Sequence, residues 1–294
     1  MARFVRWFIF LALVGLAAFY FITRPQTVDA ARFDALSGDA DRGALVFHAA
    51  GCASCHAAPK AEASDMPLLT GGQAFPSDFG TFYAPNISPD PEVGIGGWDV
   101  ADLANALTKG VSPEGQHYYP AFPYLAYSKM TDQDIVDLKA FMDDLPVSDT
   151  ASRAHEVGFP FNIRRSLGGW KFLFFNDDWV MDAADTPQLE RGRYLVEALA
   201  HCGECHTPRG PLGDLQYDAW LTGAELPGEG KIPGISPGTL SWSENDIAFY
   251  LESGFTPDFD SVGGAMAHVV ENMARLSAED RAAIAAYLKA LPET

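Results

Sequence analysis

The pattern of hydrophobic and polar positions begins with an uncharged apolar run, which extends from Trp7 to Ile22 behind two arginines. The run lacks the alternating apolar and polar faces that a core helix of a soluble domain shows. The basic flank in front of it and the aromatic residues 19–21 near its far end are typical of a membrane-crossing segment. We therefore expect residues 1–30 to be a membrane anchor, which we favour, or a signal segment that is cleaved after export.

Beyond this run, helical patterns occur twice in the same order. The spacing Trp-x3-Asp-x4-Leu-x2-Gly is found at residues 98–110 and again at residues 242–254. Each copy predicts a helix that begins at a capping residue and ends at glycine. Amphipathic stretches around Asp134 and Asp280 close the two halves, and each ends in Leu-Pro twelve residues later. The chain therefore reads as one helical unit that has been duplicated.

The repeat divides the chain into four parts. Residues 31–146 and 187–294 are the two expected domains, both built from helices only, so the expected fold class is all-α behind one membrane helix. Residues 147–186 lie between them and are rich in aromatic side chains, including Phe159 and Trp170. That composition is too apolar for a flexible linker, and it predicts a segment that packs across both domains.

All four cysteines stand in two copies of the pattern Cys-x-x-Cys-His. The first copy is Cys52, Cys55 and His56, and the second is Cys202, Cys205 and His206. This pattern is the attachment site of c-type haem, in which two thiols bind the porphyrin and the histidine ligates the iron. One helical turn presents both sulfurs to one edge of the ring. The sequence therefore predicts two covalently bound haem c groups.

Two other uses of paired cysteines fit less well. A zinc ribbon needs its two Cys-x-x-Cys pairs close together in sequence, whereas these pairs lie 150 residues apart. A thioredoxin-like redox site needs a βαβ context, which the helical pattern does not offer. Haem attachment is therefore the favoured interpretation of both motifs.

Charge restricts the partners. The chain carries 20 Lys+Arg against 39 Asp+Glu, a formal net charge of −19, which argues against nucleic-acid binding. If the first 24 residues stay with the membrane, the exported part has 17 basic and 39 acidic side chains, a net charge of −22. Such a surface steers basic partners towards it.

Several longer segments resemble a known family. They are Phe79-Gly80-Thr81-Phe82-Tyr83-Ala84-Pro85-Asn86-Ile87, Gly94-Ile95-Gly96-Gly97-Trp98, Tyr119-Pro120-Ala121-Phe122-Pro123-Tyr124, Phe159-Pro160-Phe161-Asn162 and Gly263-Gly264-Ala265-Met266. In these the chain resembles the membrane-attached cytochrome c subunits of bacterial alcohol, aldehyde and gluconate dehydrogenases, and more closely their shorter diheme members. The resemblance implies two tandem class I cytochrome c domains on the periplasmic face of the bacterial inner membrane. It also implies a periplasmic dehydrogenase as electron donor, with a cytochrome or an oxidase as acceptor.

The sequence identifies the ligand on the distal side of each haem iron less directly than it identifies the motif histidine. Met266 lies twelve residues after Gly254, where the family places its ligand, although Met273 is an alternative. The matching residue of the first half is Phe122, which cannot bind iron. Three possibilities then remain for the first haem. We favour Met130, while His117 would give two histidine ligands, and a site without a sixth ligand would be open to small molecules.

Two function classes follow from these ligands. The favoured one is an electron carrier between a dehydrogenase and the respiratory chain, in which the protein supplies ligands, burial and spacing for the haems. The alternative is a diheme enzyme, of peroxidase or sulfur-compound dehydrogenase type, that uses the haem near Phe122 as reaction centre. Candidate donors to the haem propionates are Trp98, Trp242, Arg209, Arg164 and Arg165, because buried carboxylates require charge-assisted partners.

Overall fold

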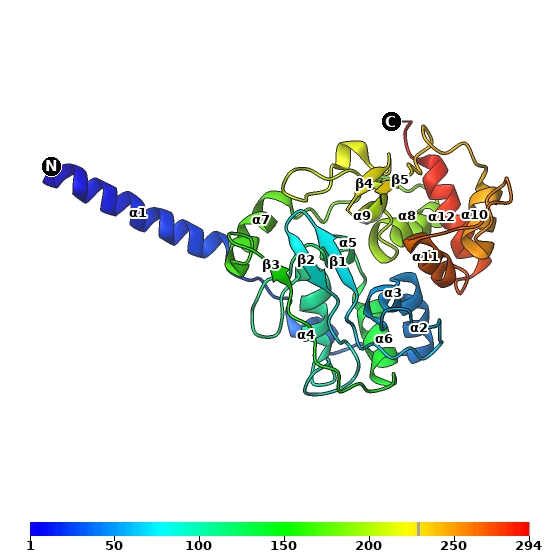
Figure 1. Ribbon diagram of the computed structural model, residues 1–294, viewed down its shortest axis with the longest axis horizontal. Coiled ribbons are helices and arrows are strands. Elements are labelled where there is room, and N and C mark those ends of the chain that lie inside the picture. Colours follow the sequence, from blue (N-terminus) through cyan, green and yellow to red (C-terminus); the bar gives the residue numbers. More distant parts are fainter. Residues whose placement is uncertain (228–229, 294) are drawn as a thin grey trace.

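The computed structural model describes residues 1–227 and 230–293, and one long helix projects from a body of short helices (Figure 1). This helix, α1 (Ala2–Ile22), has 21 residues, none of them buried. Its mean hydropathy reaches 2.1 over 18 residues. At 1.5 Å per residue it measures about 32 Å, close to the thickness of a bilayer core. Its length and composition are therefore consistent with the expected membrane anchor.

The first helical unit follows a short 3-10 turn, η1 (Ala30–Phe33). Its helices are α2 (Ala40–Ala49), α3 (Cys52–His56), α4 (Val100–Ala104) with its π-helical continuation η2 (Asn105–Lys109), α5 (Tyr124–Tyr127) and α6 (Asp132–Asp143). The first and last of them, α2 and α6, pack against each other. Between them lies a core that includes Phe47, Leu103 and Ile135.

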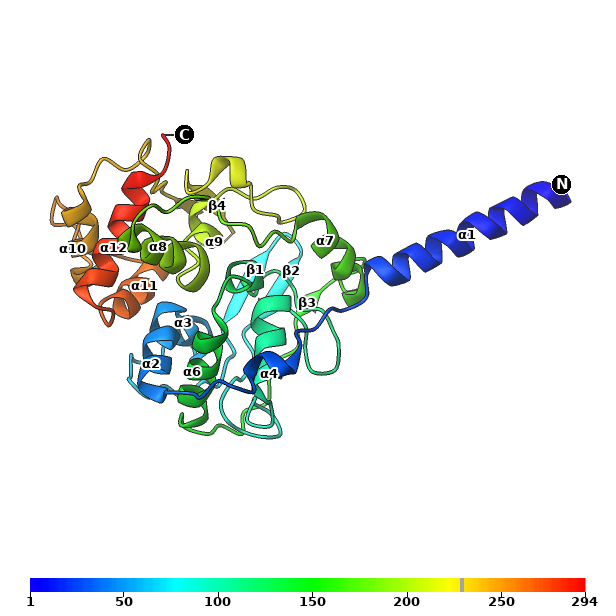
Figure 2. The ribbon, with the colours of Figure 1, turned by 180° about the vertical axis from the view of Figure 1, so that it is seen from behind.

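The second unit repeats this arrangement (Figure 2). It consists of α8 (Pro187–Arg193) with its π-helical continuation η4 (Tyr194–Leu199), α9 (Gly203–His206), the 3-10 turn η5 (Tyr217–Ala219), α10 (Glu244–Ser253), α11 (Ala265–Met273) and α12 (Ala278–Ala290). Here α8 packs on α12, as α2 packs on α6. The buried residues of both units form one continuous cluster, which includes Leu195 and Ile284. The two units therefore share a core.

A glycine lets the first and last helices of each unit approach closely. A Cβ atom on Gly43 would lie 2.0 Å from the carbonyl oxygen of Asp137 in α6. A Cβ atom on Gly192 would lie 2.1 Å from the carbonyl oxygen of Ala283 in α12. Each glycine follows an arginine, Arg42 in the first unit and Arg191 in the second, so this repeated pair marks the point where the two helix backbones meet.

The predicted helix ends are confirmed in the middle of each unit. In α4 the Asp99 carboxylate accepts from the Asp102 amide, and in α10 Ser243 caps the Asp246 amide, with a full capping box in both. The two helices end at Gly110 and Gly254, both in the left-handed conformation that terminates helices.

Short strands correct the expectation of an all-α fold. The hairpin β1 (Ala74–Ser77) and β2 (Gly80–Tyr83) pairs Ala74 with Tyr83, and β3 (Glu156–Val157) adds to the other edge of β2, antiparallel. In the second unit β4 (Ala224–Leu226) pairs antiparallel with β5 (Gly230–Ile232). Of these strands, β1, β2, β4 and β5 lie in the long loops after the haem motifs, while β3 lies in the segment between the halves; their pairing satisfies backbone groups that no helix engages. Helices still form the shared core.

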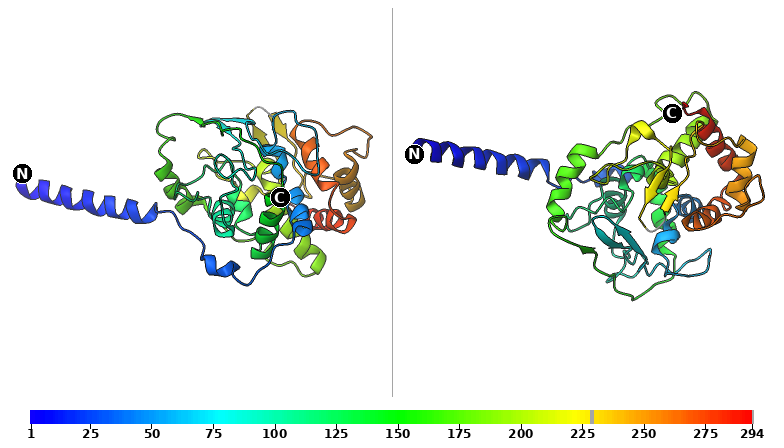
Figure 3. Two further views of the ribbon diagram at one scale, coloured as in Figure 1. Left: turned by 90° about the horizontal axis from the view of Figure 1, so that it is seen from below. Right: turned by 45° about the horizontal axis from the view of Figure 1, so that its top comes forward.

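The segment between the two halves contacts both of them (Figure 3). It contains β3, η3 (Arg164–Ser166) and α7 (Leu167–Phe174). The indole Nε1 of Trp170 donates to the carbonyl of Leu212 in the second half at 2.9 Å. The Tyr119 hydroxyl of the first half donates to the carbonyl of Phe161 at 3.2 Å. This agrees with the expectation of a packed segment.

Candidate haem sites

The first motif occupies α3, directly after the left-handed residue Gly51, and it places Cys52, Cys55 and His56 on one helical turn. The second motif occupies the turn that ends as α9, with Cys202 at its N-cap. None of the four cysteines forms a disulfide bond. Burial raises the pKa of the Cys52 and Cys202 thiols to about 12. Both motifs thus present two thiols and an imidazole from one short helix.

Each motif histidine is held by a proline carbonyl. The Nδ1 atom of His56 lies 2.9 Å from the oxygen of Pro85, and that of His206 lies 2.7 Å from the oxygen of Pro233. A carbonyl can only accept, so each ring carries its proton on Nδ1 and leaves Nε2 as the free lone pair. Burial lowers the pKa of both imidazoles, which favours this neutral form. The arrangement matches the second-shell support that ligating histidines receive.

Backbone contacts also recur around the two histidines. The carbonyl of His56 accepts from the Gly71 amide at 2.7 Å, and that of His206 accepts from the Gly223 amide at 2.7 Å. These contacts were missed at the level of sequence. Two repeated sequence patterns could have revealed them: Leu-Thr-Gly at residues 69–71 and 221–223, and Pro-x-Ile at residues 85–87 and 233–235.

The donor set fits haem c in both units. The two thiols of each motif would bind the porphyrin edge, and the Nε2 lone pair of the adjacent histidine would be available to the iron. Among residues 1–227 and 230–293, no group of three or more His, Cys, Asp or Glu side chains could hold a metal ion by itself. The zinc alternative therefore has no support, and a haem iron held by one histidine and the porphyrin does not need such a group.

The two motifs lie side by side across the contact between the units. The Asn272 side-chain amide of α11 donates to Ser54 Oγ, inside the first motif, at 2.8 Å. The Nε2 atom of His201, next to the second motif, lies 3.3 Å from the carbonyl oxygen of Ala50. Burial and, to a smaller extent, the nearby Cys205 raise the pKa of the Cys55 thiol to about 11. The first motif is therefore in direct contact with the second unit.

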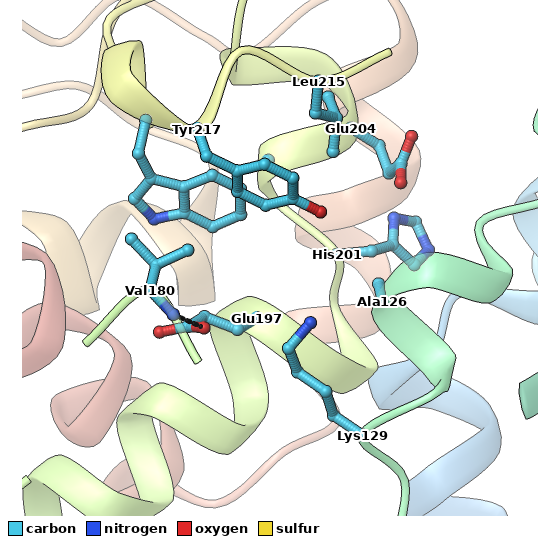
Figure 4. A pocket seen from close by; sticks show the side chains of 10 residues that line it. Ala126, Lys129, Val180, Glu197, His201, Glu204, Leu215 and Tyr217 are labelled. Carbon is cyan, nitrogen blue, oxygen red and sulfur yellow. Dashed lines mark hydrogen bonds between the residues drawn. The ribbon is translucent and has the colours of Figure 1, made fainter. Parts of the chain in front are cut away.

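Aromatic and charged side chains fill the space between the units (Figure 4). The Tyr127 hydroxyl donates to the carbonyl of Ala50 at 2.9 Å, and its ring meets the His201 ring edge to face at 5.6 Å. A small pocket beside them is lined by Lys129, Glu197 and other residues, including Glu204 of the second motif. Burial lowers the pKa of Lys129. This pocket places charged groups beside the second motif.

His117 is engaged away from both motifs. Its Nε2 donates to the carbonyl of Thr23, just after α1, at 2.9 Å. Its Nδ1 lies 3.2 Å from Lys171 Nζ, which acts as the donor. Because both ring nitrogens are used, the geometry gives no support to His117 as the distal ligand of the first haem.

The methionine candidates occupy different environments. Met130 is 6% exposed in the shared core, just before α6, and the matching residue of the second unit is the equally buried Leu276. Met266 lies in the first turn of α11 and packs partly buried against the core. Phe122 contacts the rings of Tyr118 and Tyr127. Iron ligation by Met130 and Met266 stays a prediction.

The propionate candidates divide into two groups. Arg165 donates to Thr23 Oγ1 at 2.8 Å and to the carbonyl of Tyr20 at 2.9 Å, so it is committed to the end of α1. Arg209 pairs with the Glu204 carboxylate. Within the described part of the chain, Arg164 Nε is buried without a hydrogen-bond partner, and so is the hydroxyl of Tyr124, which the sequence did not indicate as a propionate donor. Such orphaned donors are free to bind a carboxylate.

Comparison with known proteins agrees with this geometry. The cytochrome c family model matches residues 40–146 and again residues 189–292. A diheme cytochrome c-type protein of Cereibacter sphaeroides is 55% identical over 96% of both chains. The fructose dehydrogenase cytochrome subunit of Gluconobacter japonicus is 37% identical over 85% of this chain. The gluconate 2-dehydrogenase cytochrome c subunit of Pantoea cypripedii is 34% identical over the same share.

These matches define the class of protein: a c-type cytochrome with two haem domains in one chain. The chain belongs to the cytochrome c family, and it carries two covalently bound haem c groups. Attachment at Cys52, Cys55 and His56 and at Cys202, Cys205 and His206 stays a prediction. The chain spans only 52% of the Gluconobacter subunit and 59% of the Pantoea subunit. The diheme relative, by contrast, is matched over nearly its whole length.

Proposed function

We propose that this diheme cytochrome c receives electrons from a dehydrogenase at the periplasmic face of the bacterial inner membrane and passes them to the respiratory chain. The contact between the two motifs is the observation that carries the proposal. Asn272 reaches Ser54 and His201 reaches Ala50, so both haem-bearing turns belong to one contact between the units. An electron that enters at one haem then has a short protein path to the other.

The membrane location rests on α1. The helix is apolar and long enough to span the bilayer, none of its residues is buried, and its last turn is joined to the body through Tyr20. The arginines at its N-terminal end favour a cytoplasmic start, which places the cytochrome body in the periplasm. We propose that α1 is retained as an anchor.

The donor class is suggested by the relatives. Several are cytochrome subunits of dehydrogenases, named for fructose, gluconate and quinone-linked alcohol oxidation. Because the chain covers only about half of most of these proteins, their substrates are not carried over. We propose only that the donor is a periplasmic dehydrogenase, and that a cytochrome or an oxidase accepts the electrons.

Substrate-driven haem reduction tests this proposal. Membranes that contain the full chain are given fructose, gluconate or ethanol in turn, and haem reduction and oxygen uptake are followed together. At least one substrate should reduce both haems, and membranes of a strain without the chain should lose the matching oxygen uptake. Ascorbate reduction serves as the control for intact haems. Haems that ascorbate reduces but that no dehydrogenase substrate reaches would contradict the proposal.

The phenylalanine at position 122, where the second half has Met266, supports one alternative. With His117 engaged elsewhere, Met130 and an open site are the two remaining candidates for the distal side of the first haem. Carbon monoxide, cyanide and peroxide distinguish these cases on the purified full chain. A carrier should bind none of them quickly, whereas rapid binding or turnover at one haem would favour a diheme enzyme.

A further inference from the structure

Exposed apolar side chains gather where α1 meets the body of the protein. The group has five members, of which four are at least 45% exposed, and Phe159 reaches 81%. They flank η3 or lie on the outer side of α7, and we call them the apolar collar: Phe159, Phe161, Ile163, Phe172 and Leu173. An exposed apolar patch of this kind marks a contact with a partner or a membrane.

Hydrogen bonds and a close backbone contact hold the segment that carries the apolar collar beside the last turn of α1. Arg165 of η3 donates to the carbonyl of Tyr20 at 2.9 Å and to Thr23 Oγ1 at 2.8 Å. A Cβ atom on Gly168 of α7 would lie 2.5 Å from the carbonyl oxygen of Thr23, so the two backbones touch. Figures 1 and 3 show α7 against this end of α1.

Further contacts fix this junction. Thr23 is only 1% exposed, and its carbonyl also accepts from His117 Nε2 at 2.9 Å. Lys171 of α7 donates to the carbonyls of Lys109 and Gly110 at the end of η2. Polar contacts therefore join α1, the first unit and α7. The depth of α1 in a bilayer consequently sets the depth of the collar.

The charges around the collar fit the surface of a bilayer. The protein as a whole is acidic, yet Arg24, Arg164 and Arg165 lie at the junction, and Arg24 is exposed there directly after α1. Aromatic side chains beside Lys and Arg are typical of the membrane interface, where rings enter the acyl boundary and cations meet phosphate groups. A soluble redox partner attracted by the acidic surface would not prefer this basic region.

We infer that the apolar collar inserts into the headgroup region of the bilayer that α1 crosses, and that it holds the cytochrome body on the membrane in one orientation. The lipid occupant follows from the continuity of the collar with α1 and from the surrounding cations. This inference rests on the proposed retention of α1 as an anchor. It adds a second membrane contact, so the distance of each haem from the bilayer is fixed rather than set by a flexible tether.

Photo-crosslinking in lipid nanodiscs tests the collar on the full chain. The photoreactive residue p-benzoylphenylalanine replaces Phe172 or Phe159, and adducts with phospholipid are measured by mass spectrometry. Phe259, which is 85% exposed in the second unit, is the matched control, and Phe10 in α1 reports the anchor itself. Haem absorbance verifies that each variant is folded and loaded.

We expect lipid adducts at Phe172 and Phe159 in at least fivefold excess over Phe259, together with strong labelling at Phe10. If Phe10 is labelled but Phe172 and Phe159 give no more lipid adducts than Phe259, the collar proposal is wrong and the anchor proposal stands. If Phe10 is not labelled, both the collar proposal and the retained-anchor proposal are wrong. In native membranes, protein adducts at the collar in place of lipid adducts would overturn the lipid assignment in favour of a partner subunit.

Discussion

The side-chain amide of Asn272 donates a 2.8 Å hydrogen bond to Ser54 Oγ, which lies between the two cysteines of the first haem motif. Asn272 also donates to the carbonyl of His268, and its side chain is largely buried in α11. The second unit thus contacts the first at the turn that carries its haem. Any movement between the units must break this bond before the haems separate.

A double-mutant cycle measures that contact. Asn272→Ala and Ser54→Ala each remove the hydrogen bond from one side, and each should lower the free energy of unfolding by about 1 kcal/mol. Because they remove the same bond, the double variant should lose less than the sum of the two. Chemical denaturation followed by haem absorbance checks this, and full additivity would show that the bond contributes nothing.

Alanine at the helix-crossing glycines should be strongly destabilising. A Cβ atom on Gly43 or Gly192 would meet a backbone oxygen at 2.0 or 2.1 Å, so one helix must move away from the other. We expect Gly43→Ala or Gly192→Ala to lower the free energy of unfolding by about 3 kcal/mol. Gly158→Ala is the control, since no atom lies within 4 Å of its Cβ position. Equal thermal unfolding midpoints for Gly43→Ala and Gly158→Ala would contradict the prediction.

A buried carboxylate in α6 should make the stability of the fold depend on acid pH. Burial by itself raises the pKa of Asp137, but hydrogen bonds from Arg42, Gln133 and the Asp39 amide outweigh it and lower the pKa overall. A carboxyl whose pKa is lowered by folding stabilises the fold above its unfolded pKa of about 4. That stabilisation is lost as the pH falls through the lower folded value.

Asp137→Asn tests the pH dependence. At neutral pH the variant should lose about 2 kcal/mol, because an ionised acceptor of several hydrogen bonds becomes a neutral amide. Its stability should also fall less steeply than that of the parent chain below pH 4. Thermal unfolding at several pH values measures both effects, with Asp41→Asn on the exposed side of α2 as the control. Parallel acid limbs for parent and Asp137→Asn would rule out this role.

The sequence predicted the parts of the fold that depend on neighbouring residues. The capped helix starts at Asp99 and Ser243 and the helix ends at Gly110 and Gly254 are local patterns, and they appear where expected. The two Cys-x-x-Cys-His motifs are local patterns as well, and each lies on one helical turn. Local patterns suffice because caps and haem attachment each involve residues within a few positions of one another.

Contacts between distant segments were not predictable in the same way. His117 was a candidate iron ligand, but the end of α1, 94 positions earlier, takes its Nε2 proton. Arg165 was a candidate for a propionate, but it holds Tyr20 and Thr23. No spacing within one chain segment reveals which of several polar groups a folded chain will bring together. The contacts of His56 with Pro85 and of His206 with Pro233 also join distant segments, although the Pro-x-Ile pattern repeated at both prolines was visible in the sequence.

The repeat also supplies the sharpest test of the distal ligands. Leucine stands at position 276 of the second unit, where the first unit has Met130, so Met130→Leu keeps a buried apolar side chain while it removes the sulfur. If Met130 binds the first iron, this variant should lose the absorption band of one methionine-ligated ferric haem and bind carbon monoxide at that haem. Met266→Leu should do the same for the second haem, and Phe122→Met should place a sulfur at the position that corresponds to Met266. If Met130→Leu leaves both spectra unchanged, while Phe122→Met adds a methionine band and blocks carbon monoxide, the first haem of the parent chain is open. That result would exclude Met130 and direct attention to small molecules that bind beside Phe122.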